Sequence, residues 1–175
     1  MIWKKLTVTC TEKKMNEDTL TQLITRGGIY YAVPGADKKE IVSNLIDNLK
    51  GDGKPLPSSI SDTLLKAVME REALISTGME NGIALPHPRT PMLEEGEEPF
   101  VAMAFPSQPV DWQTADNSKV HTVFLIVSKS PKQHLDVLSK INVLCQDKGF
   151  LYLICNHAPK EKIIAAIEEA EKDWR

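Results

Sequence analysis

The sequence predicts an α/β domain in which one β-sheet carries helices on both faces. Segments with apolar residues at helical spacing alternate with short, wholly apolar runs typical of buried strands. Helices that alternate with strands pack on the two faces of one sheet. The 175 residues suffice for one domain, or for one domain with a short appendage. With 42% apolar and 26% charged residues, the composition is that of a globular protein with its own core.

The first half of the chain is bounded by glycine and proline pairs. Residues 16–26 form an expected helix that stops at Gly27-Gly28, and residues 29–33 form an expected strand closed by Pro34-Gly35. Apolar residues at helical spacing predict a helix over 38–49 and another over 59–71. The turn-rich stretch 51–57 links these two helices.

The second half alternates in the same way. A short apolar strand begins at Ile83 and runs into Pro86, and residues 101–105 and 120–127 read as buried strands. The glutamate-rich residues 91–99 and the segment 106–117 read as loops. Helices are expected over 130–147 and over 159–172, the last with Pro159 at its first position.

Composition excludes several classes of function. A net charge of −3 argues against general nucleic-acid binding, which needs a basic face. No apolar run approaches the ~20 residues of a membrane helix, so we expect no direct membrane insertion and no signal peptide. Three widely spaced cysteines, Cys10, Cys145 and Cys155, favour a reducing, cytoplasmic location, and each is expected to be a small core residue.

His87 lies between two prolines, directly after the short strand that starts at Ile83. Pro86 fixes its own φ, and Pro88 drives His87 towards an extended conformation. The backbone there is stiff and holds one imidazole in one direction. The alternative interpretation is a rigid loop with an incidental histidine.

His134 falls in the first turn of the helix expected over 130–147, after a possible capping box of Ser130 and Gln133. At about 100° per residue, Leu138 and Ile141 fall within about 40° of His134, so the imidazole lies on the apolar face. Such a histidine is either satisfied in the core or lines a pocket.

Arg71 closes the helix expected over 59–71 and falls within about 20° of Leu64 on its apolar face. It either binds the last carbonyls of its own helix or faces a site. Together with His87 and His134 it favours an anion site, since the guanidinium matches phosphate oxygens and an imidazole can attack phosphorus. No metal or cofactor is required, and His121 and His157 share no ligand spacing with His87.

Residues 71–87 read REALISTGMENGIALPH, and residues 133–138 read QHLDVL. These segments resemble the signature of the fructose/mannitol/nitrogen-regulatory enzyme IIA family of the bacterial sugar phosphotransferase system. The resemblance covers roughly residues 28–171. It implies a single mixed β-sheet flanked by helices on both faces, as in mannitol-type enzyme IIA. The expected division is a helical extension, 1–27, and an enzyme IIA-like phosphocarrier domain, 28–175.

The resemblance implies that His87 is phosphorylated and that Arg71 and His134 support it. The donor would be the histidine phosphocarrier protein HPr, and the acceptor a IIB domain, which makes the chain a phosphotransferase of sugar transport. The alternative is a regulatory module whose phosphorylation state controls binding to a target protein. A third hypothesis is a degenerate interaction domain that is not phosphorylated.

One departure from the family pattern concerns the residue after the phosphorylated histidine. The family usually has a small residue there, whereas this chain has Pro88, which lacks a backbone N–H donor. The hydroxyls of Ser76 and Thr77 are therefore candidate donors to a phosphoryl group. Their alternative role is to shape the turn before Gly78.

Overall fold

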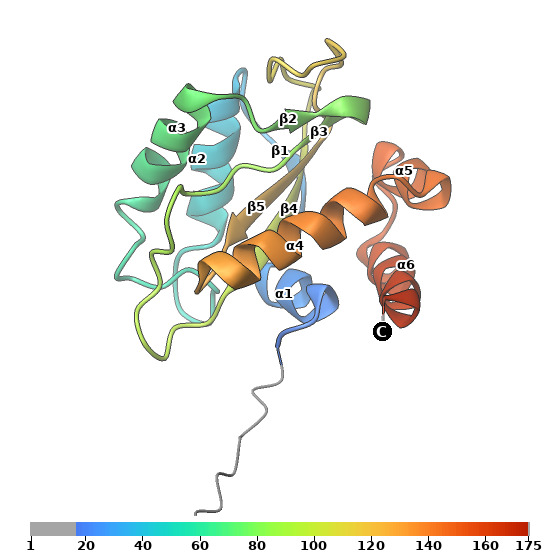
Figure 1. Cartoon of the computed structure of the whole chain (residues 1–175). Helices are drawn as coiled ribbons and strands as arrows, with labels where there is room; N and C mark the ends of the chain where they lie inside the picture. The colour runs from blue at the N-terminus through green and yellow to red at the C-terminus, as the bar shows by residue number, and fades with distance from the viewer. Residues whose placement is uncertain (1–16, 175) are drawn as a thin grey trace, which may run out of the picture.

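The computed structural model describes residues 17–174, so Cys10 and the expected helix start at Asn16 lie outside the described residues. Within that range the chain forms a five-stranded sheet and its surrounding helices (Figure 1). The strands are β1 (Ile29–Val33), β2 (Gly78–Met79), β3 (Ile83–Ala84), β4 (Phe100–Pro106) and β5 (Thr122–Val127). The helices are α1 (Leu20–Gly27), α2 (Lys38–Asn48), α3 (Leu64–Leu74), η1 (Glu80–Gly82), α4 (Pro131–Leu144), α5 (Lys148–Cys155) and α6 (Lys160–Asp173).

The sheet is mixed, with the strand order β1-β4-β5-β3-β2. β1 runs parallel to β4, β4 runs antiparallel to β5, and β3 runs parallel to β5 with Ile83 opposite Thr122. The short β2 pairs antiparallel with β3 at the edge. The predicted single mixed sheet with helices on both faces is confirmed.

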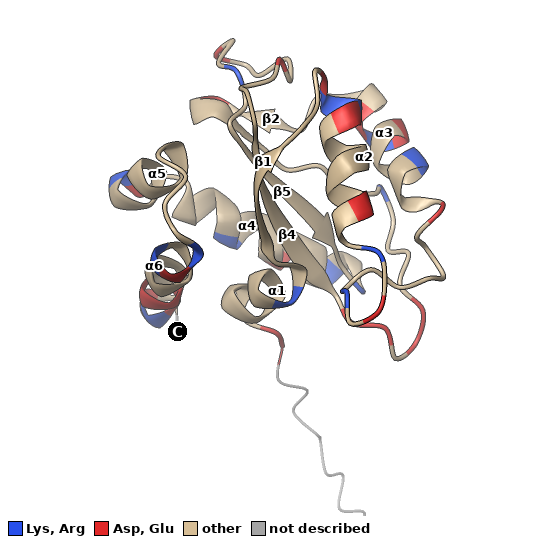
Figure 2. Ribbon diagram, turned by 180° about the vertical axis from the view of Figure 1, so that it is seen from behind, with Lys and Arg blue, Asp and Glu red and all other residues tan. Residues whose placement is uncertain are grey.

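Side-chain alternation along β4 divides the interior into two cores. Phe100, Ala102 and Ala104 pack with the apolar residues of α2 and α3. Val101, Met103 and Phe105 face the opposite way and pack with α1, α4, α5 and α6. β4 and β5 are buried along their whole length, which explains their uninterrupted apolar sequence. The charged residues lie on helices and loops, and the strands carry none (Figure 2).

α1 is pinned to the sheet and to α6. A Cβ on Gly27 would lie 2.1 Å from the carbonyl oxygen of Val101, so only glycine allows the helix to approach β4 this closely. The Glu171 carboxylate of α6 accepts hydrogen bonds from the backbone N–H of Leu20 and from the Thr21 hydroxyl. α1 thus shares a core with β4 and α6, and the division of the chain after residue 27 stays a prediction.

Several predicted element limits are wrong. The residues before Leu64 form successive turns, because the run Ser58-Ser59-Ile60-Ser61-Asp62-Thr63 is rich in side chains that compete for backbone hydrogen bonds. β5 starts at Thr122, while Val120 makes an isolated bridge with Val110 inside the predicted 106–117 loop region.

The helix predicted over 130–147 ends at Leu144, and a second helix, α5, was not predicted. The side chain of Asp147 accepts a hydrogen bond from the backbone N–H of Phe150, so this residue caps a new helix instead of ending the old one. Cys155 of α5 is exposed, which corrects its assignment to the core, whereas Cys145 is buried as expected. α6 starts at Lys160, one residue later than predicted, so Pro159 is its N-cap and not its first residue.

Candidate functional site

The parallel pair β3 and β5 places two segments at one edge of the sheet. β3 leads into Pro86, whose carbonyl accepts a hydrogen bond from the backbone N–H of Ile126 in β5. His87 therefore follows β3, and Ser128 follows β5, at the carboxyl ends of neighbouring strands. α4 starts three residues after Ser128, so its amino terminus also lies there. This end of a parallel pair is where α/β sheets present their ligand sites.

His87 is held by the main chain. The residue is buried, with 8% of its surface exposed, and both flanking prolines are buried too. Its Nδ1 lies 2.7 Å from the carbonyl oxygen of Leu85. A carbonyl only accepts hydrogen bonds, so Nδ1 carries the proton and the neutral ring keeps a lone pair on Nε2.

The electrostatic surroundings keep the His87 imidazole neutral near pH 7. Burial lowers its pKa, the bond to the Leu85 carbonyl opposes that change, and the positive charge of Arg71 lowers the pKa further. Glu72 acts in the opposite direction, to a smaller extent. An uncharged ring with a free Nε2 lone pair is the form that attacks an electrophile.

His134 faces His87 from the first turn of α4. The two ring centroids lie 4.5 Å apart, at an angle of 53° between the ring planes. The Nδ1 atom of His134 lies 3.5 Å from the Ser128 hydroxyl. Burial, then the neighbouring His87 and Arg71, lower the pKa of His134 to about 4, so this ring too is neutral near pH 7.

The amino terminus of α4 is capped in part as expected. The hydroxyl of Ser130 accepts a hydrogen bond from the backbone N–H of Gln133. The Gln133 side chain bonds the backbone N–H of Lys129 instead of that of Ser130, so the expected capping box does not close. Pro131 occupies the first position of the helix, where a backbone N–H donor is not needed.

Arg71 is half-buried in the last turn of α3, and its Nη1 donates to the carbonyl oxygen of Ile75, 2.9 Å away. Its charge lowers the pKa of both His87 and His134. Of the three residues that the sequence singled out, His87 and His134 are in contact, and the charge of Arg71 acts on both rings. The expected alternative for Arg71, a bond to a carbonyl at the end of its own helix, is present at the same time.

Ser76 and Thr77 both use their hydroxyl protons inside the protein. The Ser76 hydroxyl donates to the carbonyl of Trp112, and the Thr77 hydroxyl donates to the Glu72 carboxylate. In each bond the two oxygen atoms lie 2.5 Å apart. The Ser76 oxygen also accepts from the backbone N–H of Gly78. These bonds support the turn-shaping role, and the role of the two hydroxyls as phosphoryl donors stays a prediction.

Glu72 is a residue of this region to which the sequence assigned no role. Its side chain is 2% exposed, although it follows Arg71 directly on α3. It forms an ion pair with Lys38 of α2, at 3.2 Å. The only signal in the sequence was its place in the motif at residues 71–87.

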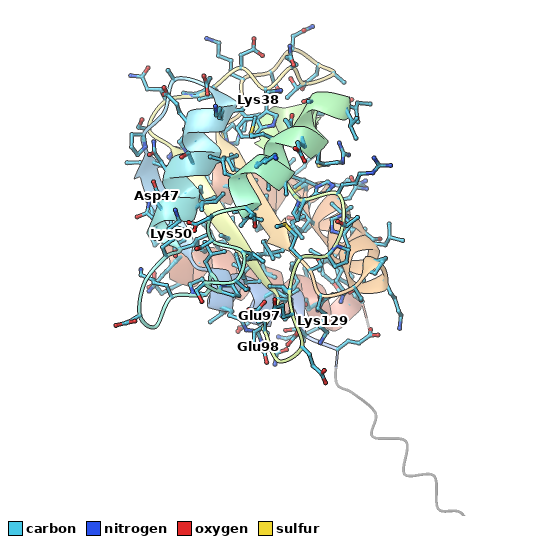
Figure 3. The ribbon with its side chains drawn as sticks, turned by 90° about the vertical axis from the view of Figure 1, so that its left-hand side faces the viewer. Lys38, Asp47, Lys50, Glu97, Glu98 and Lys129 are labelled. Carbon is cyan, nitrogen blue, oxygen red and sulfur yellow. The ribbon has the colours of Figure 1, made fainter. Side chains whose placement is uncertain are left out.

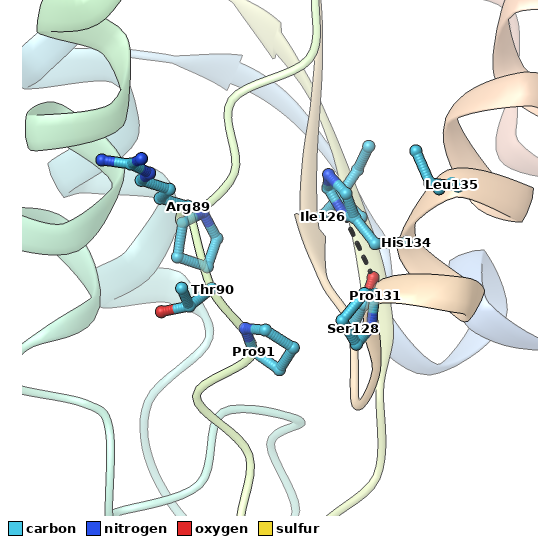
Figure 4. Close-up of a pocket in the computed structure, with 9 residues that line it drawn as sticks. Arg89, Thr90, Pro91, Ile126, Ser128, Pro131, His134 and Leu135 are labelled. Atoms are coloured by element: carbon cyan, nitrogen blue, oxygen red, sulfur yellow. Dashed lines mark hydrogen bonds between the residues drawn. The ribbon is translucent and has the colours of Figure 1, made fainter.

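A pocket of about 250 Å³ opens beside His134 (Figure 4). The loop that follows His87 forms one wall, and the end of β5 with the start of α4 forms the other. Its lining includes Pro88, Pro91, Ile126, Pro131, His134 and Leu135. Large apolar side chains are exposed on both helices next to the site, namely Leu74 and Ile75 at the end of α3 and Leu135 on α4.

The chemistry of this arrangement is that of a covalent carrier of an electrophilic group. It has one fixed nucleophilic nitrogen, one fixed cation and a second imidazole at a helix amino terminus, where negative charge is stabilised. Within residues 17–174 no cluster of three or more His, Cys, Asp or Glu residues has the geometry to hold a metal ion. In the same range, no helix combines the length and the apolar character needed to cross a bilayer.

Comparison with known proteins gives the class. Residues 22–170 match the family model described as "Phosphoenolpyruvate-dependent sugar phosphotransferase system, EIIA 2". The match covers most of the chain, and the chain belongs to this family of enzyme IIA-type phosphocarriers. The membership expected from residues 71–87 and 133–138 is confirmed.

Individual relatives fall in two functional groups. The nitrogen regulatory protein of Pseudomonas aeruginosa is 32% identical over 124 residues, which is 70% of this chain and 77% of the relative. The mannitol-specific phosphotransferase enzyme IIA component of Staphylococcus aureus (strain MRSA252) is 33% identical over 125 residues, 68% of this chain and 81% of the relative. The chain spans only 24% of another relative, the fructose-specific EIIABC component of Bacillus subtilis.

Solved structures share the fold. The nitrogen regulatory protein IIA-Ntr of Neisseria meningitidis superimposes with a TM-score of 0.69 at 21% identity, over 84% of this chain and 97% of that chain. The enzyme IIA of the Escherichia coli mannitol IIA–IIB complex superimposes with a TM-score of 0.65 at 14% identity, over 82% and 95% of the two chains. At these identities the likeness establishes the fold alone.

Proposed function

We propose that the protein is a phosphohistidine carrier that takes a phosphoryl group from phosphorylated HPr on His87 and passes it to a IIB domain. The observation that carries this proposal is the state of the His87 ring. Its Nδ1–H is held by the Leu85 carbonyl, and Nε2 is left as the nucleophile beside Arg71 and His134. Since HPr is a cytoplasmic donor, this role places the protein in the cytoplasm.

The transfer step follows from the tautomer. The Nε2 lone pair of His87 forms a bond to phosphorus as the N–P bond of the donor breaks, and the electron pair of that bond returns to the donor imidazole. The proton on Nδ1 of His87 stays in place, so the phosphorylated ring carries a positive charge. The Leu85 carbonyl, 2.7 Å from Nδ1, stabilises that charge.

Arg71 and His134 stabilise the negative charge of the phosphoryl oxygens. The guanidinium is always charged and supplies positive charge without a proton transfer. The neutral imidazole of His134 has one N–H to donate, and the amino terminus of α4 adds the positive end of a helix dipole. Phosphoryl transfer depends mainly on such positioning and charge stabilisation.

The surface around His87 fits transient docking. Leu74, Ile75 and Leu135 expose apolar side chains next to the site, and the partner must dock there for in-line transfer. A small interface of this kind releases its partner after each transfer, as a carrier requires. The solved IIA–IIB mannitol complex of Escherichia coli gives a structural precedent for the acceptor.

Intact mass measurement tests the carrier role. The purified protein is incubated with phosphoenolpyruvate, enzyme I and HPr from the same organism. We expect a gain of one acid-labile phosphoryl group, absent in His87→Ala and present in the matched variant His121→Ala. No gain in the wild-type protein, with HPr itself phosphorylated, would contradict the proposal and favour a non-phosphorylated binding domain.

A regulatory role is the second candidate, because a nitrogen regulatory protein is among the relatives above 30% identity. The same His87 chemistry would then set the affinity for a target protein. Incubation of the phosphorylated protein with the IIB domains of the same organism distinguishes the two roles. Transfer to a IIB domain supports transport, and a stable phosphoprotein whose target affinity differs between its two forms supports regulation.

A further inference from the structure

Glu72 is buried, and both oxygen atoms of its carboxylate accept hydrogen bonds. Oε1 accepts from Lys38 Nζ at 3.2 Å and from the backbone N–H of Thr77 at 3.1 Å. Oε2 accepts from the Thr77 hydroxyl at 2.5 Å. A buried carboxylate is costly unless such donors compensate it, so these contacts define the place of Thr77 relative to α3.

Thr77 in turn is bonded to the segment that joins β3 to His87. The carbonyl of Thr77 accepts a hydrogen bond from the backbone N–H of Leu85, at 3.1 Å. The carbonyl of Leu85 then accepts from Nδ1 of His87, at 2.7 Å. An unbroken series of hydrogen bonds therefore runs from Glu72 through Thr77 and Leu85 to the His87 imidazole.

Glu72 is also linked to Arg71, through the residues that follow α3. The guanidinium of Arg71 is held by the carbonyl of Ile75, which lies two residues before Thr77. Ile75 ends α3 in an extended conformation, so the chain from Ile75 to Thr77 crosses from the helix towards β2. The attachment of Thr77 to Glu72 thus also fixes the carbonyl that orients Arg71.

Lys38 anchors this arrangement from another helix. It lies at the first position of α2 (Figure 3), and its ammonium group also donates to the side chain of Gln113, at 3.3 Å. The ammonium compensates the charge of Glu72 at Oε1, the oxygen that also accepts from the backbone N–H of Thr77. α2, α3 and the turn before β2 meet at this one carboxylate.

We propose that Glu72 is a positioning residue for phosphoryl transfer, which keeps the His87 imidazole and the Arg71 guanidinium in register through Thr77. The proposal rests on the carrier function proposed above. Thr77 is then a structural link of the site and not a ligand of the phosphoryl group. The negative charge of Glu72 also acts on His87 directly and raises its pKa.

The variant Glu72→Gln tests the proposal. An amide keeps the size of the side chain but cannot accept from both Thr77 donors and Lys38 at once. Glu70→Gln is the matched control, since Glu70 lies on the same helix with an exposed side chain paired to Lys66. We expect kcat for transfer from phosphorylated HPr to fall about a hundredfold in Glu72→Gln, the effect of misplacing a reacting group by about 1 Å. KM for HPr and all parameters of Glu70→Gln should stay at wild-type values.

Titration of His87 by NMR gives a readout that general destabilisation would not produce. In Glu72→Gln we expect the pKa of His87 to fall below its wild-type value, because a negative charge that raises it is gone. We also expect a changed Nδ1 proton signal, since the Leu85 carbonyl is no longer fixed. A folded Glu72→Gln protein with wild-type kcat and wild-type His87 titration would overturn the proposal.

Thr77→Val covers the case in which Glu72→Gln does not fold. Valine removes the hydroxyl bond to Glu72 but keeps the backbone one, and Thr77→Ser keeps both. We expect about a tenfold loss of kcat in Thr77→Val, the effect of one hydrogen bond, and little change in Thr77→Ser. Equal transfer rates in Thr77→Val and Thr77→Ser would overturn the proposal. If the wild-type protein accepts no phosphoryl group, the carrier function fails, and the His87 titrations of these variants still test the positioning role.

Discussion

Two pairs of histidines lie close to the ends of this sheet, and we propose a phosphoryl site at only one of them. His87 and His134 lie at the carboxyl ends of β3 and β5, with ring centroids 4.5 Å apart. His121 and His157 lie near the opposite end of β5, with centroids 6.5 Å apart. The residue type and the approximate proximity are common to both pairs.

The surroundings of the two pairs differ. A main-chain carbonyl fixes the tautomer of His87, and the positive charge of Arg71 acts on both rings of its pair. His121 bonds the hydroxyl of its neighbour Thr122, which can donate or accept, so this bond does not select a tautomer. His157 is exposed and stacks on Phe105 at 4.6 Å.

On the proposed function, two close imidazoles alone do not make a phosphoryl site. The fixed tautomer, the arginine and the helix amino terminus distinguish the first pair, and each can be removed separately. Substitutions in the two pairs and at Arg71 test this distinction, and they are given in order of decreasing expected effect.

Replacement of the proposed nucleophile should have the largest effect. His87→Gln should reduce phosphoryl acceptance from HPr to an undetectable level, because no other group offers a lone pair at that position. The equivalent change in the other pair, His121→Gln, should leave the rate unchanged. Quenched-flow measurement of the phosphorylated fraction checks both, and a loss in His121→Gln would contradict the distinction between the pairs.

Removal of the arginine charge comes next. Arg71→Met should lower the transfer rate by about 10²–10³-fold, the usual effect of deleting one group that stabilises transition-state charge. Lys66→Met, on the exposed side of the same helix, is the control. Single-turnover rates with phosphorylated HPr measure the effect, and equal rates in the two variants would show that Arg71 does not act on the phosphoryl group.

His134 should affect the pH dependence of stability. Its pKa of about 4 in the folded protein lies below the ordinary value of about 6.5, so the unfolded chain binds more protons between these values. The free energy of unfolding should therefore decrease as the pH falls from about 6.5 to about 4, and the decrease should be smaller in His134→Gln. Urea unfolding at several pH values measures the slope, and identical slopes in the two proteins would contradict this assignment.

The smallest effect is expected at His157. This residue has a φ of 48°, in the left-handed region. His157→Gly should relieve about 1 kcal/mol of backbone strain and lose about 0.5–1.5 kcal/mol of stacking on Phe105, so stability should change little. His157→Ala keeps the strain and loses the stacking, so it should be less stable than His157→Gly in urea unfolding. The reverse order would show that the backbone strain is absent.

The sequence predicted the fold class correctly and some limits closely. β1 has the predicted limits, because Gly27-Gly28 and Pro34-Gly35 close it on both sides. α5 was missed because its run Phe150-Leu151-Tyr152-Leu153-Ile154-Cys155 is apolar all round, although Tyr152 and Cys155 are exposed. A run without polar positions carries no helical period, so the pattern alone does not reveal it.

The site shows the same limit. His87, Arg71 and His134 were found from flanking prolines and helix phase, which are local properties. Glu72 escaped because a carboxylate on a helix normally faces solvent. Its burial depends on Lys38, 34 residues earlier in the chain, and no local pattern records such a partner. The same holds for the Ser76 hydroxyl, whose acceptor is the carbonyl of Trp112, 36 residues later.

The buried prolines on either side of His87 have a consequence for the speed of recognition. A flexible active-site loop loses conformational entropy each time a partner orders it, and that loss slows association or weakens the complex. Here Pro86 and Pro88 restrict the chain during folding, so the encounter with a partner orders little more of it. Docking then approaches that of two rigid bodies, and a complex with a small interface forms and separates quickly. Turnover of such a relay would be set by the rate of collisions between proteins and not by a motion of this domain.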